Sequence, residues 1–360
     1  MVRVAVAGTG AFGRNHLRVY RELEAAGLGV TLAAAVEPDE ARAAAVAEKY
    51  AIPVFSSVEK LLAADLRLDA ATVAVPTVNH HAVAMVLLQA GLDVLVEKPI
   101  ASTLAEADEL AQAAAKAGRI LQPGHLERFN PAVLAVQPRL RRPMFFEAHR
   151  LSVFTPRSLD VDVVLDLMIH DLDIVLTFAR SPVREVRAVG LPILSPRVDI
   201  ANVRVELESG CVANFTASRV STERVRKLRF FEPRQYVSID YARQDLLVIR
   251  LDGSVPAEIA AAIAGGRVDP AVMAQLAAAG GAAQAGGPGP GLNLAHVPVT
   301  PGEPLRLEIE SFLESVRMRR EPKVTALQGR DALALALEIQ SAMAAHAARA
   351  GLEDFFAAGA

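Results

Sequence analysis

Residues 163–176, VVLDLMIHDLDIVL, place groups capable of acid–base chemistry within an otherwise apolar stretch. An ionised carboxylate is costly to bury unless it is paired or hydrogen-bonded. The stretch holds no glycine or proline, and at about 100° per residue an α-helix would bring Asp166, His170 and Asp173 onto one face. The pattern predicts a helix with an apolar face toward a core and a polar face toward an active site. Asp171 falls elsewhere on the helical wheel and is expected to be a surface or capping acid.

The N-terminal residues predict a dinucleotide site. Residues 2–7, VRVAVA, read as a short buried strand. Gly8, Gly10 and Gly13 follow with G-x-G-x-x-G spacing and open a predicted helix. In this motif one glycine makes a tight turn, one lets a pyrophosphate approach the backbone, and one lets the helix pack against the strand. The free N–H groups of the first helical turn would then face the phosphates with a partial positive charge.

Glu37 is the predicted ribose-binding acid, with a solvated loop acid as the alternative. Residues 30–50 read as a strand that ends at Val36, with Glu37 at its tip, and then as a helix. Glu37 follows Gly13 by 24 residues, close to the spacing expected for a carboxylate on the ribose hydroxyls. A carboxylate there would repel a 2′-phosphate, so NAD is favoured over NADP. Arg42 is interpreted as a helix-surface residue.

Two further strands carry polar residues at their ends. DAATVAVPTVNHH reads as a strand that ends at Val75 and is stopped by Pro76. LDVLVEKPIA reads as another strand, with Glu97, Lys98 and Pro99 at its end. Strands that alternate with helices imply a parallel sheet, and such sheets bind ligands at the carboxyl ends of their strands. Lys98 is therefore expected to face a substrate.

Beyond about residue 123 the pattern changes to successive strands with short turns. Strands without intervening helices predict an antiparallel sheet in an α+β domain. We therefore expect a nucleotide-binding domain at residues 1–122 and a second domain at 123–360, with a flexible Ala/Gly-rich insertion at about 254–300. His296 in that insertion is expected at the surface. A large sheet with apolar residues on both faces needs cover, which predicts a homodimer or homotetramer.

The composition of the 360 residues excludes several classes of protein. A formal net charge of −3 gives no excess of positive charge for nucleic acid or an anionic membrane. The single cysteine, Cys211, excludes an intrachain disulfide framework. We find neither a signal peptide nor an apolar run of about 18 residues, and expect a cytoplasmic protein. No metal is expected, because Asp166, His170 and Asp173 have no obvious further ligands and Lys98 would disfavour a cation.

Three stretches together resemble the glucose–fructose oxidoreductase, inositol dehydrogenase and rhizopine-catabolism (Gfo/Idh/MocA) family. They are AVAGTGAFGRNH, VPTVNHHAVAMVLLQAGLDVLVEKP and LDLMIHDLD, and a helix, a loop with Pro322 and a final helix complete the resemblance. It implies an α/β Rossmann domain with a parallel sheet, followed by an α+β domain with a large, mostly antiparallel sheet. It also implies an NAD(P)-dependent oxidoreductase that acts on CH–OH groups.

The resemblance also assigns roles to individual residues. Lys98 of the E-K-P motif would be a catalytic lysine, with Asp166 and His170, spaced as D-x-x-x-H, as its partners. His170 would act as general base, and Lys98 would stabilise negative charge on the reacting oxygen. Asp173 would hold the histidine or the helix in place. The expected cofactor-binding residues are Gly8, Gly10, Ala11, Phe12, Gly13, Glu37, Pro76, His80, Glu97, Lys98 and Arg128.

The stretch GHLERFNPAV, residues 124–133, indicates a narrower match. It resembles the family branch that oxidises the 3-hydroxyl of UDP-N-acetylglucosamine. Arg128 within it would contact the nicotinamide amide or a phosphate, or would form a structural ion pair. His16, His80 and His81 lie near the expected cleft and are candidates for contact with cofactor or substrate.

Other functions are consistent with the same motifs. The substrate would otherwise be a free sugar, an inositol or a small aldehyde. A glycosidase that uses bound NAD on the same fold would release a free sugar without net NADH. A non-catalytic NAD-binding regulator would have no use for Lys98, Asp166 and His170 together.

Overall fold

The computed structural model describes residues 1–155, 161–251 and 292–352, and the chain forms two compact units, each built from three segments. The first unit comprises Met1–Asn130, Leu172–Ile174 and Gly302–Gln340. The second unit comprises Pro131–Asp171, Val175–Pro301 and Ser341–Ala360.

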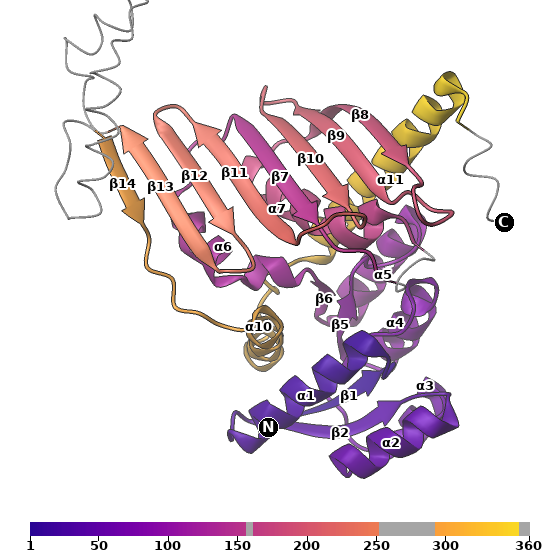
Figure 1. Ribbon diagram of the computed structural model, residues 1–360. Helices are drawn as coiled ribbons and strands as arrows, with labels where there is room; N and C mark the ends of the chain where they lie inside the picture. Colours follow the sequence, from indigo (N-terminus) through magenta and orange to yellow (C-terminus); the bar gives the residue numbers. More distant parts are fainter. Residues whose placement is uncertain (156–160, 252–291, 353–360) are drawn as a thin grey trace, which may run out of the picture. The chain divides into compact units, whose positions relative to one another are not determined.

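The first unit contains a parallel sheet of six strands in the order β3-β2-β1-β4-β5-β6 (Figure 1). The order reverses direction between β1 and β4, and ligands of open α/β sheets bind at such a switch point, beyond the carboxyl ends of the strands. This sheet confirms the predicted parallel α/β domain. The strands are β1 Val2–Ala7, β2 Val30–Val36, β3 Val54–Phe55, β4 Ala70–Val73, β5 Asp93–Glu97 and β6 Leu121–Gly124.

Helices connect these strands, and their ends follow local sequence signals. Thr103 caps one helix by accepting a hydrogen bond from the backbone N–H of Glu106, whose side chain bonds back to the Thr103 backbone, as in a capping box. Gly118 ends the same helix in the left-handed conformation that glycine adopts without strain. The helices are α1 Ala11–Ala25, α2 Glu40–Tyr50, α3 Val58–Ala63, η1 Thr77–Asn79, α4 His80–Gln89, α5 Leu104–Ala117 and η2 Leu126–Phe129.

The first unit also includes Gly302–Gln340, which the predicted boundary at residue 122 assigns to the second domain. Helix α10, Pro304–Met318, packs on α1 and β1. Its Ile309 and Phe312 are fully buried in the core of the first unit. The change of periodicity near residue 123 marks where the sheet type changes, and cannot reveal a helix that returns to the first sheet much later in the chain.

The second unit contains an eight-stranded sheet in the order β14-β13-β12-β11-β7-β10-β9-β8 (Figure 1). Its strands pair antiparallel except β7 and β10, which are parallel, so the predicted mostly antiparallel sheet is confirmed. The strands are β7 Phe145–Leu151, β8 Val183–Leu191, β9 Ile200–Leu207, β10 Val212–Ser218, β11 Val225–Glu232, β12 Gln235–Asp240, β13 Asp245–Leu251 and β14 Leu292–His296.

Helices cover one face of this sheet, and Figure 1 shows α7 behind the strands. Phe178 of α7 packs edge-on against Phe230 of β11, with ring centroids 6.0 Å apart. A side chain at Gly190 of β8 would come within 2.4 Å of the sulfur of Met343, so glycine there admits the final part of α11. The helices are α6 Pro131–Val136, η3 Gln137–Arg139, η4 Val164–Met168, α7 Ile169–Ala179 (without Leu172–Ile174, which belong to the first unit) and the part of α11 Ala326–Ala350 from Ser341 onward.

The predicted insertion at residues 254–300 falls only partly within the described chain. Residues 252–291 lie outside it. Residues 292–296 form β14, which pairs antiparallel with β13, so this part of the predicted insertion belongs to the sheet. The strand sequence LNLAH is short and follows a long Ala/Gly-rich run. Composition alone therefore did not predict a strand there.

Candidate active site

The glycine turn after β1 has the geometry that a dinucleotide requires. Gly8 has φ +87°, and a Cβ there would lie 2.6 Å from the carbonyl oxygen of Ala74. A Cβ at Gly13 would lie 1.9 Å from the carbonyl oxygen of Gly8, whereas a Cβ at Gly10 would meet nothing within 4 Å. The first and third glycines are thus required by packing, and the second leaves open space where a pyrophosphate can approach the backbone. The residues present fit NAD.

Glu37 stands at the carboxyl end of β2 with its carboxylate held in place. It accepts hydrogen bonds from the Thr9 hydroxyl at 2.6 Å and from the Thr9 and Asp39 backbone N–H groups. Burial alone would raise the pKa of Glu37, but these hydrogen bonds and one from Arg42 lower it. The carboxylate is therefore ionised at neutral pH. Arg42 is exposed as expected, but its guanidinium also lies 3.1 Å from Glu37.

His80 is buried between two backbone carbonyls. Its Nδ1 lies 2.8 Å from the oxygen of Pro99, and its Nε2 lies 3.0 Å from the oxygen of Val75. Burial lowers the pKa of His80. The ring therefore joins the segment after β4 to the segment after β5, which begins with Lys98. Pro76, the neighbouring predicted residue, is exposed.

Glu97 and His16 form a buried pair beside Lys98. The Nε2 of His16 lies 2.6 Å from Oε1 of Glu97, and Oε2 of Glu97 accepts the backbone N–H of Lys98 at 3.3 Å. Burial would raise the pKa of Glu97, but the hydrogen bond and charge of His16 and the charge of Lys98 lower it. Lys98 itself is half-buried, immediately after β5. His81, the third candidate histidine, is half-buried and lies 2.8 Å from a carboxylate oxygen of Glu109.

Arg128 forms an ion pair, the second of the two roles expected for it. Its Nη1 lies 3.3 Å from Oδ1 of Asp173, and both side chains are buried. Another guanidinium nitrogen donates to the backbone oxygen of Lys323. Asp173 also lies 4.0 Å from Nδ1 of His125, so its carboxylate faces these groups rather than an open cavity.

Asp166 and His170 lie on one helical segment of the second unit. The predicted helix exists, but its first turn, η4, is a π-helix, a widened turn that is rare and often found at functional sites. Asp166 is half-buried and His170 is buried. The expectation for Asp171 is wrong. Asp171 is buried and accepts two hydrogen bonds from Arg150, at 2.8 and 3.0 Å.

The structure thus gathers most predicted cofactor residues at one edge of the first sheet. The turn after β1, the tip of β2 and the ends of β4 and β5 all lie at the carboxyl edge of adjacent parallel strands. Ala11 and Phe12 begin α1 there and are exposed.

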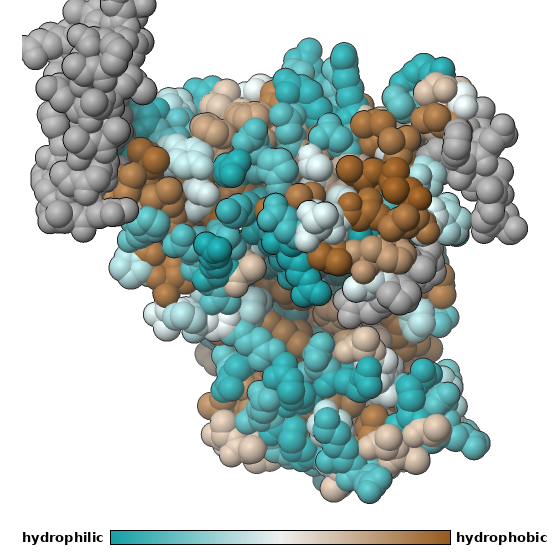
Figure 2. Space-filling model, viewed as in Figure 1, coloured by the Kyte–Doolittle hydropathy of each residue, from teal (hydrophilic) through white to brown (hydrophobic). Residues whose placement is uncertain are grey.

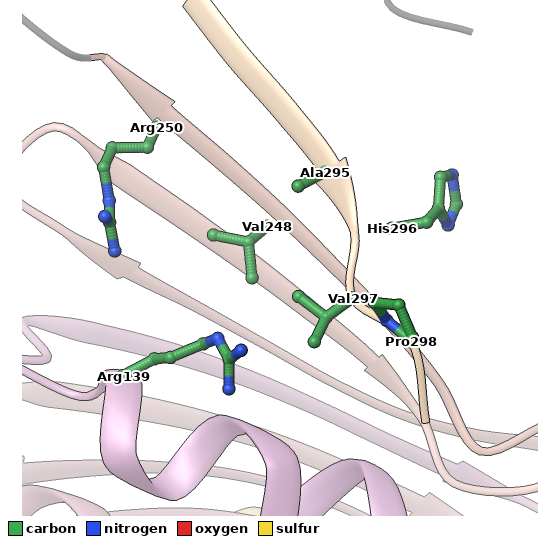
Figure 3. Close-up of a pocket in the computed structure, with 7 residues that line it drawn as sticks. All are labelled: Arg139, Val248, Arg250, Ala295, His296, Val297 and Pro298. Atoms are coloured by element: carbon green, nitrogen blue, oxygen red, sulfur yellow. The ribbon is translucent and has the colours of Figure 1, made fainter. Parts of the chain in front are cut away.

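A pocket of about 270 Å³ lies elsewhere, at the β13–β14 edge of the second unit. Figure 3 shows Arg139 and Arg250 on one side of the pocket and His296 on the other, with Val248 and Val297 between the two sides. None of the predicted catalytic or cofactor residues lines this pocket. His296, at its rim, is exposed as predicted.

Some residues of the first unit stand out only in the structure. Thr9 binds Glu37, but the x of a G-x-G motif carries no signal for such a role. Glu308 on α10 is fully buried, and burial, together with the charges of Glu97 and Asp173, raises its pKa well above 4.5. A glutamate in an amphipathic helix usually faces solvent, so the burial of Glu308 could not be predicted from the sequence.

The described residues contain neither a cluster of metal-ligating side chains nor a membrane-spanning helix. Within residues 1–155, 161–251 and 292–352, no group of three or more His, Cys, Asp or Glu side chains is arranged to hold a metal ion. No helix in the same ranges is long and apolar enough to cross a membrane.

Comparison with known families shows to which family this chain belongs. Residues 2–125 match the model of the oxidoreductase family with an NAD-binding Rossmann fold, GFO/IDH/MocA, and residues 132–234 match the model of the GFO/IDH/MocA C-terminal domain. The chain belongs to the GFO/IDH/MocA oxidoreductase family. It is an NAD-binding oxidoreductase of the dehydrogenase type, as the motifs predicted.

Individual relatives span the whole chain or part of it. The chain is 34% identical to the UDP-N-acetylglucosamine 3-dehydrogenase of Acidithiobacillus ferrooxidans over 96% of its own length and 98% of that protein. A solved structure of that dehydrogenase superposes with a TM-score of 0.80, covering 95% of this chain and 97% of the other. An inositol 2-dehydrogenase of Acidothermus cellulolyticus is 31% identical, over 52% of this chain and 56% of that protein.

Proposed function

We propose that this protein oxidises the 3-hydroxyl of UDP-N-acetylglucosamine with NAD as hydride acceptor. The observation that carries the proposal is the 34% identity to a UDP-N-acetylglucosamine 3-dehydrogenase along nearly the full length of both chains. The first unit supports it independently, because the glycine turn and the anchored, ionised Glu37 suit NAD.

The first unit would hold the dinucleotide with groups already in position. The backbone at Gly10 is open to the pyrophosphate, and the N–H groups that begin α1 face the same space. Glu37 would bind the adenosine ribose hydroxyls and repel a 2′-phosphate, which favours NAD over NADP. When bound, NAD accepts the hydride that leaves the substrate carbon.

The protein's own residues would handle the proton and the developing charge. We assign His170 as the general base that removes the hydroxyl proton, since imidazole titrates near neutral pH. Lys98 would donate a hydrogen bond to the reacting oxygen and stabilise its negative charge. Asp166 would orient the base or a neighbouring sugar hydroxyl.

A second candidate substrate class comes from the inositol 2-dehydrogenase relative. A cyclic polyol offers the same secondary hydroxyl as a pyranose ring, so the same catalytic groups would serve. That relative aligns with only about half of this chain, which favours the nucleotide sugar.

The test is a substrate panel with the purified protein and NAD. NADH absorbance is followed with UDP-N-acetylglucosamine, UDP-glucose, myo-inositol and free N-acetylglucosamine, with and without 2-oxoglutarate as a recycling acceptor for bound NADH. NADH or 2-hydroxyglutarate formed with UDP-N-acetylglucosamine alone is the expected result. Turnover with inositol alone would transfer the assignment to a polyol. Release of free sugar without reduced product would indicate an NAD-dependent glycosidase. Binding of NAD without any reaction would indicate a non-catalytic regulator.

We also propose that the second unit forms a homodimer, or a homotetramer built from such dimers, through the uncovered face of its sheet. Phe145, Phe231 and Tyr236 stack across β7, β11 and β12, with ring centroids 5.5 and 5.1 Å apart. Their neighbour Phe146 is buried on the helix-covered side, so Phe145 lies on the uncovered side. Figure 2 shows apolar residues among polar ones on this face of the unit.

Light scattering after size-exclusion chromatography tests the oligomer. Phe231→Arg is expected to convert the assembly to monomers, whereas Met318→Arg, at an exposed apolar residue of the first unit, leaves it intact. A monomeric wild-type protein at micromolar concentration would contradict the proposal. Because NAD and nucleotide sugars are cytoplasmic metabolites, we propose a cytoplasmic location, which cell fractionation tests.

A further inference from the structure

A chain of contacts joins the phosphate-binding helix to the backbone of Lys98. His16 lies three residues after Gly13, in the first turns of α1. Its Nε2 is 2.6 Å from one oxygen of Glu97, and the other oxygen of Glu97 accepts the Lys98 backbone N–H. His16 and Glu97 are both buried, so water cannot substitute freely for either partner.

The space around Glu97 is packed tightly enough to transmit a displacement. A Cβ at Gly124 on the adjacent strand β6 would lie 3.0 Å from the Cα of Glu97 and 3.1 Å from its Oε2. Glycine at position 124 therefore lets β6 pass directly against this carboxylate. A buried side chain in such packing has few alternative positions.

Several charged or titratable groups face Glu97 from the elements around it. Burial opposes the ionisation of Glu97, whereas the hydrogen bond with His16 lowers its pKa most, followed by electrostatic effects of His16, Lys98 and His80. The negative charge of Glu97 in turn helps to raise the pKa of a neighbouring carboxyl, that of Glu308. The groups that face Glu97 are His16 from α1, Lys98 after β5, His80 from α4, His125 after β6 and Glu308 from α10.

We propose that His16 is a positioning residue for Lys98, which it holds through Glu97, and that it links occupancy of the dinucleotide site to the placement of this lysine. The proposal rests on the proposed function for the role of Lys98. An N–H of His16 fixes Oε1 of Glu97, so that Oε2 stays aimed at the Lys98 peptide. His16 belongs to the helix that would bind the pyrophosphate. A shift of that helix on binding the cofactor would therefore also move Glu97 and the backbone of Lys98 at the end of β5.

The chemistry of the substitutions follows from this arrangement. Alanine at position 16 leaves the Glu97 carboxylate buried without its shortest hydrogen bond, and burial then favours the protonated acid. Glutamine can still donate an N–H to Glu97 but carries no charge. Tyr20→Phe is the matched control, because it removes from the same helix, α1, a buried hydroxyl that lies 2.8 Å from the Thr72 hydroxyl rather than at Glu97.

The experiment compares His16→Ala, His16→Gln and Tyr20→Phe with the wild-type protein. His16→Ala is expected to lower kcat by roughly tenfold or more, with the Kd for NAD changed by no more than about threefold. Its kcat should fall more steeply toward low pH than that of the wild type, as Glu97 takes up a proton. His16→Gln should restore most of the turnover and the wild-type pH profile, and Tyr20→Phe should leave kcat within about twofold.

A substrate-independent readout separates this proposal from the proposed function. Lys98 is labelled with acetic anhydride, with and without NAD, and the labelling rate is measured by peptide mass spectrometry. NAD should change the labelling rate of Lys98 by the same factor in the wild type and in His16→Gln, and by a different factor in His16→Ala, where only direct shielding by NAD remains. That pattern would support the positioning role even if no substrate of the panel reacts.

Three results would overturn the inference. Parallel losses of NAD affinity and turnover in His16→Ala would make His16 an ordinary part of the cofactor site. Equal defects in His16→Gln and His16→Ala would remove the hydrogen bond to Glu97 from the explanation. The same NAD-dependent change in the labelling rate of Lys98 in His16→Ala as in the wild type would show that no link passes through this residue.

Discussion

The guanidinium of Arg128 lies 3.3 Å from the carboxylate of Asp173, and both side chains are buried. Removing one partner of a buried ion pair leaves the other charge without compensation, which costs about 3–5 kcal/mol. Arg128→Ala and Asp173→Asn should each lower the free energy of unfolding by roughly that amount, measured by urea denaturation. The double variant Arg128→Met/Asp173→Leu should lose less than the sum of the single changes.

Arg204→Ala, at an exposed arginine of β9, is the control and should change stability little. If Arg128→Ala keeps its stability but loses NAD affinity, the alternative role of Arg128 as a cofactor ligand would replace the structural one.

Replacement of the proposed catalytic groups should abolish turnover while leaving the cofactor site intact. Lys98→Ala and His170→Ala should each reduce kcat by about 10²–10⁴-fold, the usual contribution of general acid–base or electrostatic catalysis. NAD binding, followed by fluorescence or calorimetry, should persist. Lys116→Ala and His296→Ala, at exposed residues, should retain full activity. Full activity of Lys98→Ala or His170→Ala would remove that residue from the mechanism.

Glu37 should set the preference between the two nicotinamide cofactors. A hydrogen bond to a charged group contributes about 1.5–3 kcal/mol, so Glu37→Ser should lower kcat/KM for NAD by about 10–100-fold. The same change removes the repulsion of a 2′-phosphate, and kcat/KM for NADP should rise. Glu40→Gln removes an equal charge at an exposed position of α2 and serves as the control. An unchanged NAD to NADP ratio in Glu37→Ser would contradict the ribose-binding role.

Glu308 should make the protein less stable as the pH rises. Its pKa is raised well above 4.5 by burial and by Glu97 and Asp173, so the folded state holds a proton that the unfolded state releases. Its contribution is fully present below about pH 4.5 and is lost as the pH climbs toward the raised value, at up to about 1.4 kcal/mol per pH unit. Glu308→Gln should remove this slope. Urea titrations at about pH 6 and about pH 8 measure it, and equal slopes in both proteins would refute the assignment.

The architecture was predictable because its determinants are local and periodic. Alternation of buried strands with helices defined the parallel sheet, and a run of strands with short turns defined the antiparallel one. The boundaries between strands were less predictable: β12 and β13 are joined by a short turn in which Gln244 has φ +54°. Glycine or asparagine usually marks such a turn, and neither is present.

The candidate site was predictable where a motif imposes backbone geometry. It was much less predictable where a side chain's position depends on a partner that is distant in the sequence. Gly8, Gly10 and Gly13 behave as their spacing requires. Asp171 was misjudged because its partner, Arg150, comes from a strand 21 residues away in sequence. For the same reason a sequence cannot show that Glu308 is buried or that His16 meets Glu97.

The most direct test of the central claim follows the hydrogen atom itself. UDP-N-acetylglucosamine deuterated at C3 of the sugar is incubated with the protein and NAD, and the reduced cofactor is analysed by mass spectrometry. The proposed function predicts one deuterium in each NADH, together with a 3-keto nucleotide sugar. Unlabelled NADH, or deuterium transferred only from a substrate labelled at another carbon, would contradict it.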